Sequence, residues 1–370
     1  MRIEAAALTA LVEAIFRAAG CDADEAMRIA TCLVRANLTG HDSHGVIRVP
    51  RYLQWLDEGR VHPGQRIAVV CEADAFAVVD GAHGFGQTIG PQAVQLGIDK
   101  ARRAGAAVIA LRRSGHLGRI GDWAEMAAAA GLVSIHLVNV SGSLLVAPFG
   151  GVDRRMATNP LAIGVPVPGA TPIILDFATS LVAEGKAMVA YDGGKVLPPD
   201  AFVCEDGSLS DDPAVFYGPR HPDADAPPSP AGGTGALRAM GAHKGSGLSI
   251  LIELLAGALT GSGCAGPGPR PFANGMLSIY LAPERFDTEG GFVAEVKRYV
   301  AFVKSARPAT PGGEVLVPGE VERRTAAARR ATGIPLPDKT WRGLIEAARR
   351  LDADKGVIAA ALDAAMDEPV

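Results

Sequence analysis

Helical periodicity at both ends of the chain, with strand-like sequence between them, is the feature that most restricts the fold. From residue 3 to about 60 apolar side chains recur at helical spacing, as at Leu8, Leu11 and Ile15, which predicts an all-helical opening. From residue 289 onward the sequence again predicts helices, three or four of them. The chain therefore begins and ends in helices and places its strands in the middle.

The middle of the chain is predicted to be a mixed α/β region with a sheet at its core. Residues 205–237 are rich in Asp, Pro and Gly, so we expect a long surface loop or flap there. Two short strands are predicted within 67–81 and single strands at 106–114, 133–140, 161–166, 172–176 and 276–283, with helices at 87–104, near 120–130 and near 179–190.

Length, charge and cysteine use narrow the class of protein. With 370 residues the chain can bury a large core, and we expect two domains. A formal net charge of -4, from 36 basic and 40 acidic residues, offers no surplus for binding nucleic acid or anionic lipid. Five scattered cysteines without CxxC or zinc-type spacing indicate a reducing, cytoplasmic compartment and no metal site. Small molecules are the expected partners.

The most apolar stretch, GLSILIELLAGALTG at 247–261, is expected to be a buried helix. It contains Glu253 and is shorter than the ~20 residues that span a bilayer. The N-terminal stretch carries Glu4 and Glu13 within an amphipathic pattern and has no signal-peptide cleavage site. We therefore expect no membrane segment.

The segment HDSHGVIRVPRY at 41–52 combines two histidines, an aspartate, a serine and two arginines. Hydride transfer between a nicotinamide and a 2-hydroxy acid needs one group that exchanges the hydroxyl proton and one fixed cation that holds the carboxylate. His44 and Arg48 are suited to these roles. The alternative is that Asp42 or Ser43 only caps a helix, with Arg48 in a surface ion pair. Composition leaves both interpretations open.

Three further segments carry candidate binding groups. RRSGHLGRIGDW at 112–123 is a glycine-rich turn between a strand and a helix, which could bind a phosphate or be only a turn; because it is not GxGxxG, no Rossmann fold is inferred. In ILDFATSLVAEGK at 174–186, Asp176 could hold a ribose, orient a histidine or cap a helix. GAHKGSGLS at 241–249 could bind an anion at a helix N-terminus or form a packing junction, and it lacks phosphate-loop spacing.

Taken in order, these segments resemble the malate/L-lactate dehydrogenase-like family of NAD(P)-dependent oxidoreductases. The likeness spans nearly the whole chain, and HLGRIGDWAE and VSIHLV are most similar to its bacterial hydroxycarboxylate (hydroxyphenylpyruvate) reductase branch. The matching blocks are ANLTGHDSHGVIRVPRY, GHLGRIGDWAEMAAAAG, VAPFGG with TNPLAIGVP, LDFATS with EGK, HKGSGLS with ELLAGALTG, and VPGE with GIPL.

The resemblance implies an α+β, non-Rossmann fold. It predicts a cofactor domain at 66–284, built on a mixed and largely antiparallel sheet, and a helical domain formed by 1–65 together with 285–370. It also implies a homodimer that uses NAD or NADP. The choice between the two cofactors stays open, because the sequence does not place Arg112, Arg113 or Arg119 relative to the ribose.

The resemblance also assigns roles to individual residues. The family histidine that protonates the substrate carbonyl matches His44, with Ser43 beside it, and the arginine that binds the substrate carboxylate matches Arg48. Thr158 matches a substrate contact. The matching cofactor contacts are His44, His116, Gly118, Arg119, Ile120, Asp176, Phe177, Ala178, Thr179, His243, Lys244, Asn274, Val317, Pro318 and Gly319.

Lys186 is a departure from one branch of the family. The cyclic-imine (piperideine/pyrroline-2-carboxylate) reductases have an aspartate there that completes a Ser-His-Asp relay, so Lys186, itself a candidate substrate contact, favours open-chain acids. Asp42 and Asp176 remain candidates for the carboxylate that orients His44.

We therefore expect an NAD(P)-dependent enzyme that interconverts a 2-hydroxy acid and a 2-oxo acid. Cyclic-imine reduction is the alternative, and a non-catalytic nicotinamide-binding protein is a remote one. The intact HDSHGVIR segment speaks against a non-catalytic role. The lack of a phosphate loop speaks against a nucleotide-hydrolysing enzyme.

Overall fold

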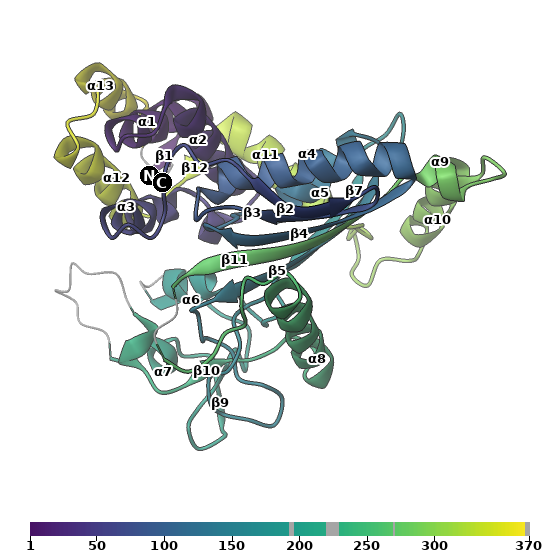
Figure 1. The fold of residues 1–370 in the computed structure, drawn as a ribbon. Helices are drawn as coiled ribbons and strands as arrows, with labels where there is room; N and C mark the ends of the chain where they lie inside the picture. Colours follow the sequence, from purple (N-terminus) through teal and green to yellow (C-terminus); the bar gives the residue numbers. More distant parts are fainter. Residues whose placement is uncertain (192–195, 220–228, 269–270, 367–370) are drawn as a thin grey trace.

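The computed structural model describes residues 1–191, 196–219, 229–268 and 271–366 (Figure 1). Its centre is a seven-stranded sheet in the order β2-β3-β4-β11-β5-β6-β7. β3 and β4 pair in parallel and every other neighbouring pair is antiparallel, which confirms a mixed, largely antiparallel sheet. The strands are β2 (Ala68–Ala73), β3 (Phe76–Asp80), β4 (Ala106–Ser114), β5 (Val133–Ser141), β6 (Leu161–Val165), β7 (Ile173–Phe177) and β11 (Ala273–Leu281).

Helices cover both faces of this sheet. α4 (Gly86–Ala104) and α5 (Gly121–Ala129) pack on one face through an apolar cluster that includes Ile89, Trp123 and Tyr280. α8 (His243–Ile252) and a π-helical turn, η4 (Glu253–Ala258), lie on the opposite face (Figure 1). Because helices cover both faces of the sheet, its strands bury side chains on both sides.

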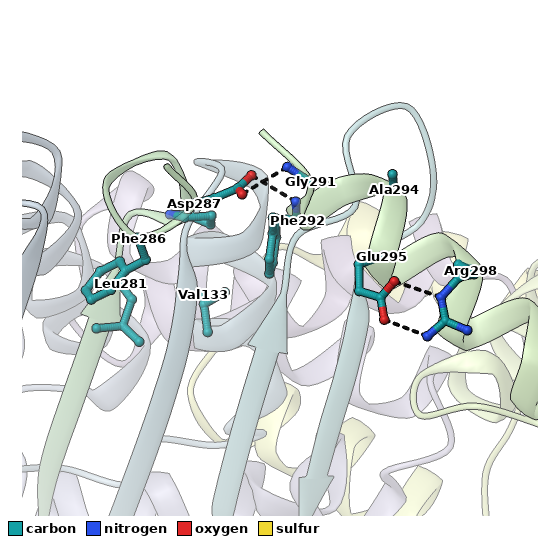
Figure 2. A pocket seen from close by; sticks show the side chains of 10 residues that line it. Val133, Leu281, Phe286, Asp287, Gly291, Phe292, Ala294, Glu295 and Arg298 are labelled. Atoms are coloured by element: carbon teal, nitrogen blue, oxygen red, sulfur yellow. Dashed lines mark hydrogen bonds and ion pairs between the residues drawn. The ribbon is translucent and has the colours of Figure 1, made fainter. Parts of the chain in front are cut away.

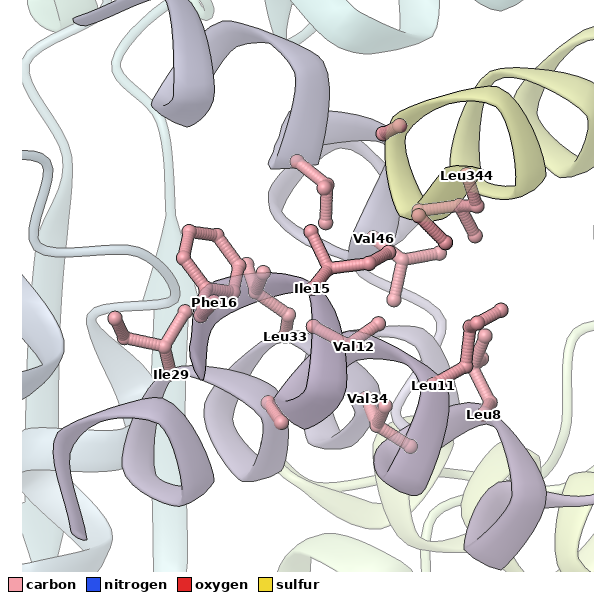
Figure 3. Packing of buried hydrophobic residues seen from close by; sticks show 14 of the residues in the cluster. Leu8, Leu11, Val12, Ile15, Phe16, Ile29, Leu33, Val34, Val46 and Leu344 are labelled. Atoms are coloured by element: carbon pink, nitrogen blue, oxygen red, sulfur yellow. The ribbon is translucent and has the colours of Figure 1, made fainter. Parts of the chain in front are cut away.

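The two ends of the chain form one helical unit, as expected. β1 (Arg2–Ile3) pairs with both β12 (Ile334–Pro335) and β13 (Ala365–Met366). Leu8, Ile15 and Leu344 belong to one buried cluster, drawn in Figure 3. The helices of this unit are α1 (Ala5–Ala18), α2 (Ala23–Leu38), α3 (Val49–Asp57), α11 (Glu320–Thr332), α12 (Asp338–Arg350) and α13 (Lys355–Asp363).

The domain bounds 1–65, 66–284 and 285–370 remain a prediction. α9 (Pro283–Phe286) and α10 (Phe292–Lys304) lie at the end of the sheet that is remote from α12 and α13 (Figure 1). α10 has no buried residue. No helix in the described part of the chain is long and apolar enough to cross a bilayer.

The expected surface loop at 205–237 is more ordered than predicted, and its residues 220–228 lie outside the described ranges. β8 (Phe202–Val203), β9 (Leu209–Ser210) and β10 (Ala236–Leu237) form a small sheet, beside α7 (Ala214–Tyr217) and a short turn, η3 (Pro230–Gly232). Arg154 explains this order, because its guanidinium lies 4.4 Å from the Phe216 ring and donates to four backbone carbonyls of the segment. The segment therefore packs as a lobe.

Two helix predictions also need correction. The helix expected near 179–190 begins later, as α6 (Glu184–Tyr191), because the hydroxyls of Thr179 and Ser180 bond backbone carbonyls and hold residues 179–182 in a bent, non-helical conformation. The stretch at 247–261 is helical but only half buried. Leu254 and Leu259 are 50% and 65% exposed, since no other described element covers that side.

Candidate active site

The segment around His44 folds as two single turns of 3₁₀ helix, η1 (Asp42–His44) and η2 (Val46–Arg48), between α2 and α3. Gly45 joins them, and a Cβ there would lie 2.6 Å from Asn37 Nδ2, so a larger residue would not fit. Asn37 Oδ1 accepts the Val46 N–H at 2.8 Å. Asp42 binds Arg329 and Asn37. These contacts fix the segment against α2 and α11.

Ser43, His44 and Arg48 are held together inside this segment. Ser43 Oγ lies 3.0 Å from His44 Nδ1, and Arg48 Nε donates to the Ser43 carbonyl at 2.6 Å. Ser43 is buried. The hydroxyl on Nδ1 orients the ring and leaves Nε2 as the nitrogen that can exchange a proton with a ligand.

His116 and Tyr52 form the adjoining wall. The rings of His44 and His116 stack with their centroids 5.6 Å apart and an interplanar angle of 7°. Tyr52 Oη lies 2.6 Å from His116 Nδ1, and Gln87 Nε2 donates to Tyr52 Oη at 3.0 Å. Four side chains from three distant segments therefore meet at one point.

Both histidines of the stack are neutral at neutral pH. Burial lowers the pKa of His44 well below its ordinary value, and the neighbouring His116 and Arg48 lower it further. Burial, with a contribution from Arg48, lowers the pKa of His116 to about 3. A neutral His44 can accept a proton directly, whereas protonating a ligand requires proton uptake from solvent or transfer through Ser43.

Arg48 reaches across to α6. Its Nη2 lies 3.3 Å from Glu184 Oε2, and Tyr217 Oη lies 3.0 Å from Glu184 Oε1. The backbones approach closely here, because a Cβ on Gly185 would be 2.8 Å from Ser43 Cα and nearer still to Ser43 Cβ. α6 is therefore seated directly against the catalytic candidates.

Neither candidate carboxylate orients His44. Asp42 is bound by Arg329, as described above, and Asp176 Oδ2 accepts the Gly121 N–H at 2.8 Å. Burial raises the pKa of Asp176, and the nearby His41 and Arg119 oppose that shift. Among the described residues the hydrogen-bond partner of the His44 ring is the Ser43 hydroxyl.

The turn at 112–123 lies between β4 and α5, as expected, but its helix N-terminus is already bonded to a carboxylate. Asp176 occupies the Gly121 N–H, and Arg119 is buried with Asp122 2.7 Å and Glu125 2.8 Å from its terminal nitrogens. Gly118 adopts φ +69°, in the left-handed region. Arg112 and Arg113 instead converge on Asp80.

Several other predicted contacts line this region through their backbones. Thr179 is buried and donates to the Thr158 carbonyl at 3.0 Å. Gly319, with φ +89°, packs on β7, where a Cβ would lie 3.4 Å from the Ile174 backbone. The turn formed by Val317, Pro318 and Gly319 therefore lies beside β7, which carries Asp176 and Phe177 and is followed by Ala178.

Asn274 is buried, and its side chain is bonded to two backbone groups of the protein. Its Oδ1 accepts the Leu117 N–H and its Nδ2 donates to the Asn139 carbonyl, each at 2.9 Å. Asn139 in turn donates to Glu253, which also accepts from Asn159 at 2.8 Å. One buried carboxylate thus supports both the His116–Leu117 turn and the Thr158–Asn159 turn.

The remaining predicted residues lie outside the His44 cluster. Lys186 is exposed and, two positions after Glu184 on α6, faces away from it. His243 and Lys244 are exposed at the start of α8. An apolar hollow of about 990 Å³ beside α9 and α10, lined by residues such as Phe286 and Phe292, contains none of the predicted site residues (Figure 2).

Sequence reasoning missed four participants. Tyr52 stands in the HDSHGVIRVPRY block and Glu184 in EGK, so proximity to a motif could have suggested them. Gln87 and Tyr217 carried no such signal. In the described part of the chain, no group of three or more His, Cys, Asp or Glu is placed to hold a metal ion.

Comparisons with known proteins agree with this architecture. Residues 3–345 match the family described as malate/L-lactate dehydrogenase. Hydroxycarboxylate dehydrogenase B of Escherichia coli strain K12 is 37% identical, over 95% of this chain and 94% of that protein. L-lactate dehydrogenase of Cupriavidus necator is 35% identical, over 95% and 98%.

A solved structure shares the same fold over nearly its full length. Sulfolactate dehydrogenase from Methanocaldococcus jannaschii superimposes with a TM-score of 0.82 at 30% identity, covering 98% of this chain and 100% of that one. Together with the match across residues 3–345, this likeness extends through both the sheet and the helical unit. The chain belongs to the malate/L-lactate dehydrogenase family.

Proposed function

We propose that this protein is an NAD(P)-dependent oxidoreductase that interconverts a 2-hydroxy acid and the corresponding 2-oxo acid. The observation that carries the proposal is the arrangement of Ser43, His44 and Arg48, with Ser43 Oγ 3.0 Å from His44 Nδ1 and Arg48 Nε bonded to the Ser43 carbonyl. One short segment thereby presents a partly buried proton-exchanging group and a fixed cation. These are the two groups that the reaction needs from the protein.

His44 exchanges the proton of the substrate oxygen through Nε2. In the oxidative direction the neutral ring accepts the hydroxyl proton, and in the reductive direction it returns a proton to the oxygen formed from the carbonyl. Arg48 binds the substrate carboxylate through its terminal nitrogens, of which Nη2 is shared with Glu184, because its Nε is engaged with Ser43. The reductive rate is expected to fall as the pH rises, since burial keeps the pKa of His44 low.

The residues around His116 fit a nicotinamide nucleotide. Gln87 Oε1 is buried without a hydrogen-bond partner among the described residues, although Gln87 Nε2 is bonded to Tyr52. An amide or hydroxyl donor on the cofactor would satisfy that oxygen. When bound, the nicotinamide ring supplies or accepts the hydride.

The residues that we assign to the cofactor come from four segments. They are the His116–Ile120 turn, the stretch from Asp176 to Thr179 and the turn at 317–319, which lie near one another, and the start of α8 with His243 and Lys244. Thr158, whose carbonyl accepts from Thr179, is assigned to the substrate. With Arg119 paired to Asp122 and Glu125, no preference for NADP follows, and both cofactors are candidates.

Assembly and compartment are part of the same proposal. The exposed side of α8 and η4 is apolar, and contiguous exposed apolar surface commonly marks a subunit interface, so we propose a homodimer. Cys21, Cys32, Cys71 and Cys204 are free thiols, in keeping with a reducing cytoplasm. The side chains on this face are Ile250, Leu251, Leu254, Leu255 and Leu259.

The test is a spectrophotometric assay with NADH and NADPH against a panel of 2-oxo acids and cyclic Δ1-imines. We expect oxidation of a cofactor with at least one 2-oxo acid, and a turnover about 100 to 10,000-fold lower in His44→Ala. Unchanged turnover in His44→Ala would reject the role of that residue. Activity with imines alone would instead identify a cyclic-imine reductase, and no oxidation with any compound would indicate a binding protein.

A further inference from the structure

Arg48 is already shared with a carboxylate of the protein. Its Nη2 lies 3.3 Å from Glu184 Oε2, while Tyr217 Oη lies 3.0 Å from Glu184 Oε1 and 3.1 Å from the Glu184 backbone oxygen. Both carboxylate oxygens of Glu184 are therefore engaged, one by a cation and the other by a hydroxyl. Glu184 on α6 thus connects Tyr217 on α7 to Arg48, the proposed binding partner of the substrate carboxylate.

The charged groups around Arg48 and Glu184 provide no excess positive charge for a second anion. His44 and His116 are partly buried and are neutral at neutral pH, because the loss of solvent around them lowers their pKa values. Arg119 is paired with Asp122 and other acids. Within the described ranges Arg48 and Glu184 pair with each other, so this part of the site carries a net charge near zero before a substrate enters.

We propose that Glu184, fixed by Tyr217, makes the enzyme select acids with a single negative charge over dicarboxylates and sulfonated acids. The inference rests on the proposed function, because it takes Arg48 as the partner of the substrate carboxylate. A monocarboxylate needs only to share Arg48 with Glu184. A second acidic group would be repelled by Glu184, and the described residues named above offer it no compensating charge.

The size of the effect follows from the distances involved. A second carboxylate on a short substrate bound at Arg48 would lie roughly 8 Å from Glu184. Two unit charges at that separation, with an effective dielectric constant of about 20, repel enough to change affinity by about 30-fold, and screening by solvent and salt reduces the expected change to about tenfold. Neutralising Glu184 should remove this penalty for the doubly charged substrate and affect the singly charged one less.

The first experiment compares kcat/KM for oxaloacetate and pyruvate in the wild type and in Glu184→Gln, which keeps the shape and removes the charge. We expect the oxaloacetate-to-pyruvate ratio to rise about tenfold, mainly through KM. Tyr217→Phe should raise it by a smaller factor, because Glu184 loses the hydroxyl that fixes it. Glu314→Gln, at an exposed carboxylate paired with Arg324, is the matched control and should leave the ratio unchanged.

A second measurement separates this inference from the proposed function. Calorimetric titration with oxamate, a monoanion, and malonate, a dianion, in the presence of NADH or NADPH requires no turnover. If Glu184→Gln turns over 2-oxo acids but changes neither the oxaloacetate-to-pyruvate ratio of kcat/KM nor the malonate-to-oxamate ratio of affinities by more than twofold, the role of Glu184 in specificity is overturned. The proposed reaction then still stands. A shifted malonate-to-oxamate ratio in a protein that turns over no 2-oxo acid supports the role of Glu184 and refutes the reaction. Circular dichroism of each variant tests whether it is folded. If Glu184→Gln does not fold, the substrate and inhibitor ratios of Tyr217→Phe test the role of Glu184 instead.

Discussion

Gly185 is the position where a single methyl group should disable the site without unfolding the protein. A Cβ at residue 185 would lie 2.8 Å from Ser43 Cα and nearer still to Ser43 Cβ. Carbon atoms that are not bonded prefer about 3.5 to 4.0 Å. In Gly185→Ala, α6 and the turn that carries Ser43 and His44 must therefore separate by about 1 Å.

The expected consequence is a loss of catalysis larger than the loss of stability. A displacement of about 1 Å in a catalytic arrangement can cost about 100-fold, so we expect kcat/KM to fall by that factor, or about 2.7 kcal/mol. Overpacking costs about 1 to 3 kcal/mol of unfolding free energy, which the better helix propensity of alanine offsets by about 1 kcal/mol. The protein should remain folded.

The assay pairs steady-state kinetics with urea denaturation in Gly185→Ala and in a control, Gly343→Ala. Gly343 lies within α12, where an added Cβ would meet only Pro50 Cγ, at 3.9 Å. The control should keep wild-type activity and gain slightly in stability. A folded Gly185→Ala protein whose kcat/KM is within twofold of wild type would refute the reasoning.

Three further outcomes are expected. Arg48→Lys should raise KM for a 2-oxo acid at least about tenfold, because an ammonium cannot form the paired contacts of a guanidinium; an unchanged KM would remove Arg48 from the substrate site. Burial lowers the pKa of His116 and His136 to about 3, so the unfolded chain binds protons below pH 6.5 that the native state does not, and stability is lost as the pH falls from that point. Between pH 7.5 and 5.5 each of these histidines should lower the free energy of unfolding, measured by urea denaturation, by about 1.4 kcal/mol. His136→Gln should make this pH dependence less steep, and a free energy of unfolding that does not change with pH would contradict the reasoning. Leu254→Asp on the exposed apolar face should produce a monomer in sedimentation velocity at concentrations where the wild type is dimeric, and an unchanged sedimentation coefficient would place the interface elsewhere.

Local patterns in the sequence identified what lies close together along the chain. His44 and Arg48 stand four residues apart, so their association could be inferred from one segment. Most helices and most strands were also predictable, because periodicity is a local property. These are the parts of the fold and of the candidate site that the sequence could disclose.

Contacts between distant segments were not predictable in the same way. Arg48 and Glu184 are 136 residues apart, and nothing in either segment indicates the other. Asp42 and Asp176 were plausible partners for His44, but Arg329 and the Gly121 amide are bonded to them. The apolar stretch at 247–261 predicted a helix correctly but not its exposure, because periodicity does not indicate what covers a face.

The pairing of β1 with β12 and β13 has a consequence for how the protein is made. Residues 2–3 pair with residues 334–335 and 365–366, so β1 has no partner until those later segments have been synthesised. Contacts of such high sequence separation slow folding. Until then the apolar faces of α1 and α2 stay incompletely covered, and a nascent chain in that condition is a natural client of chaperones.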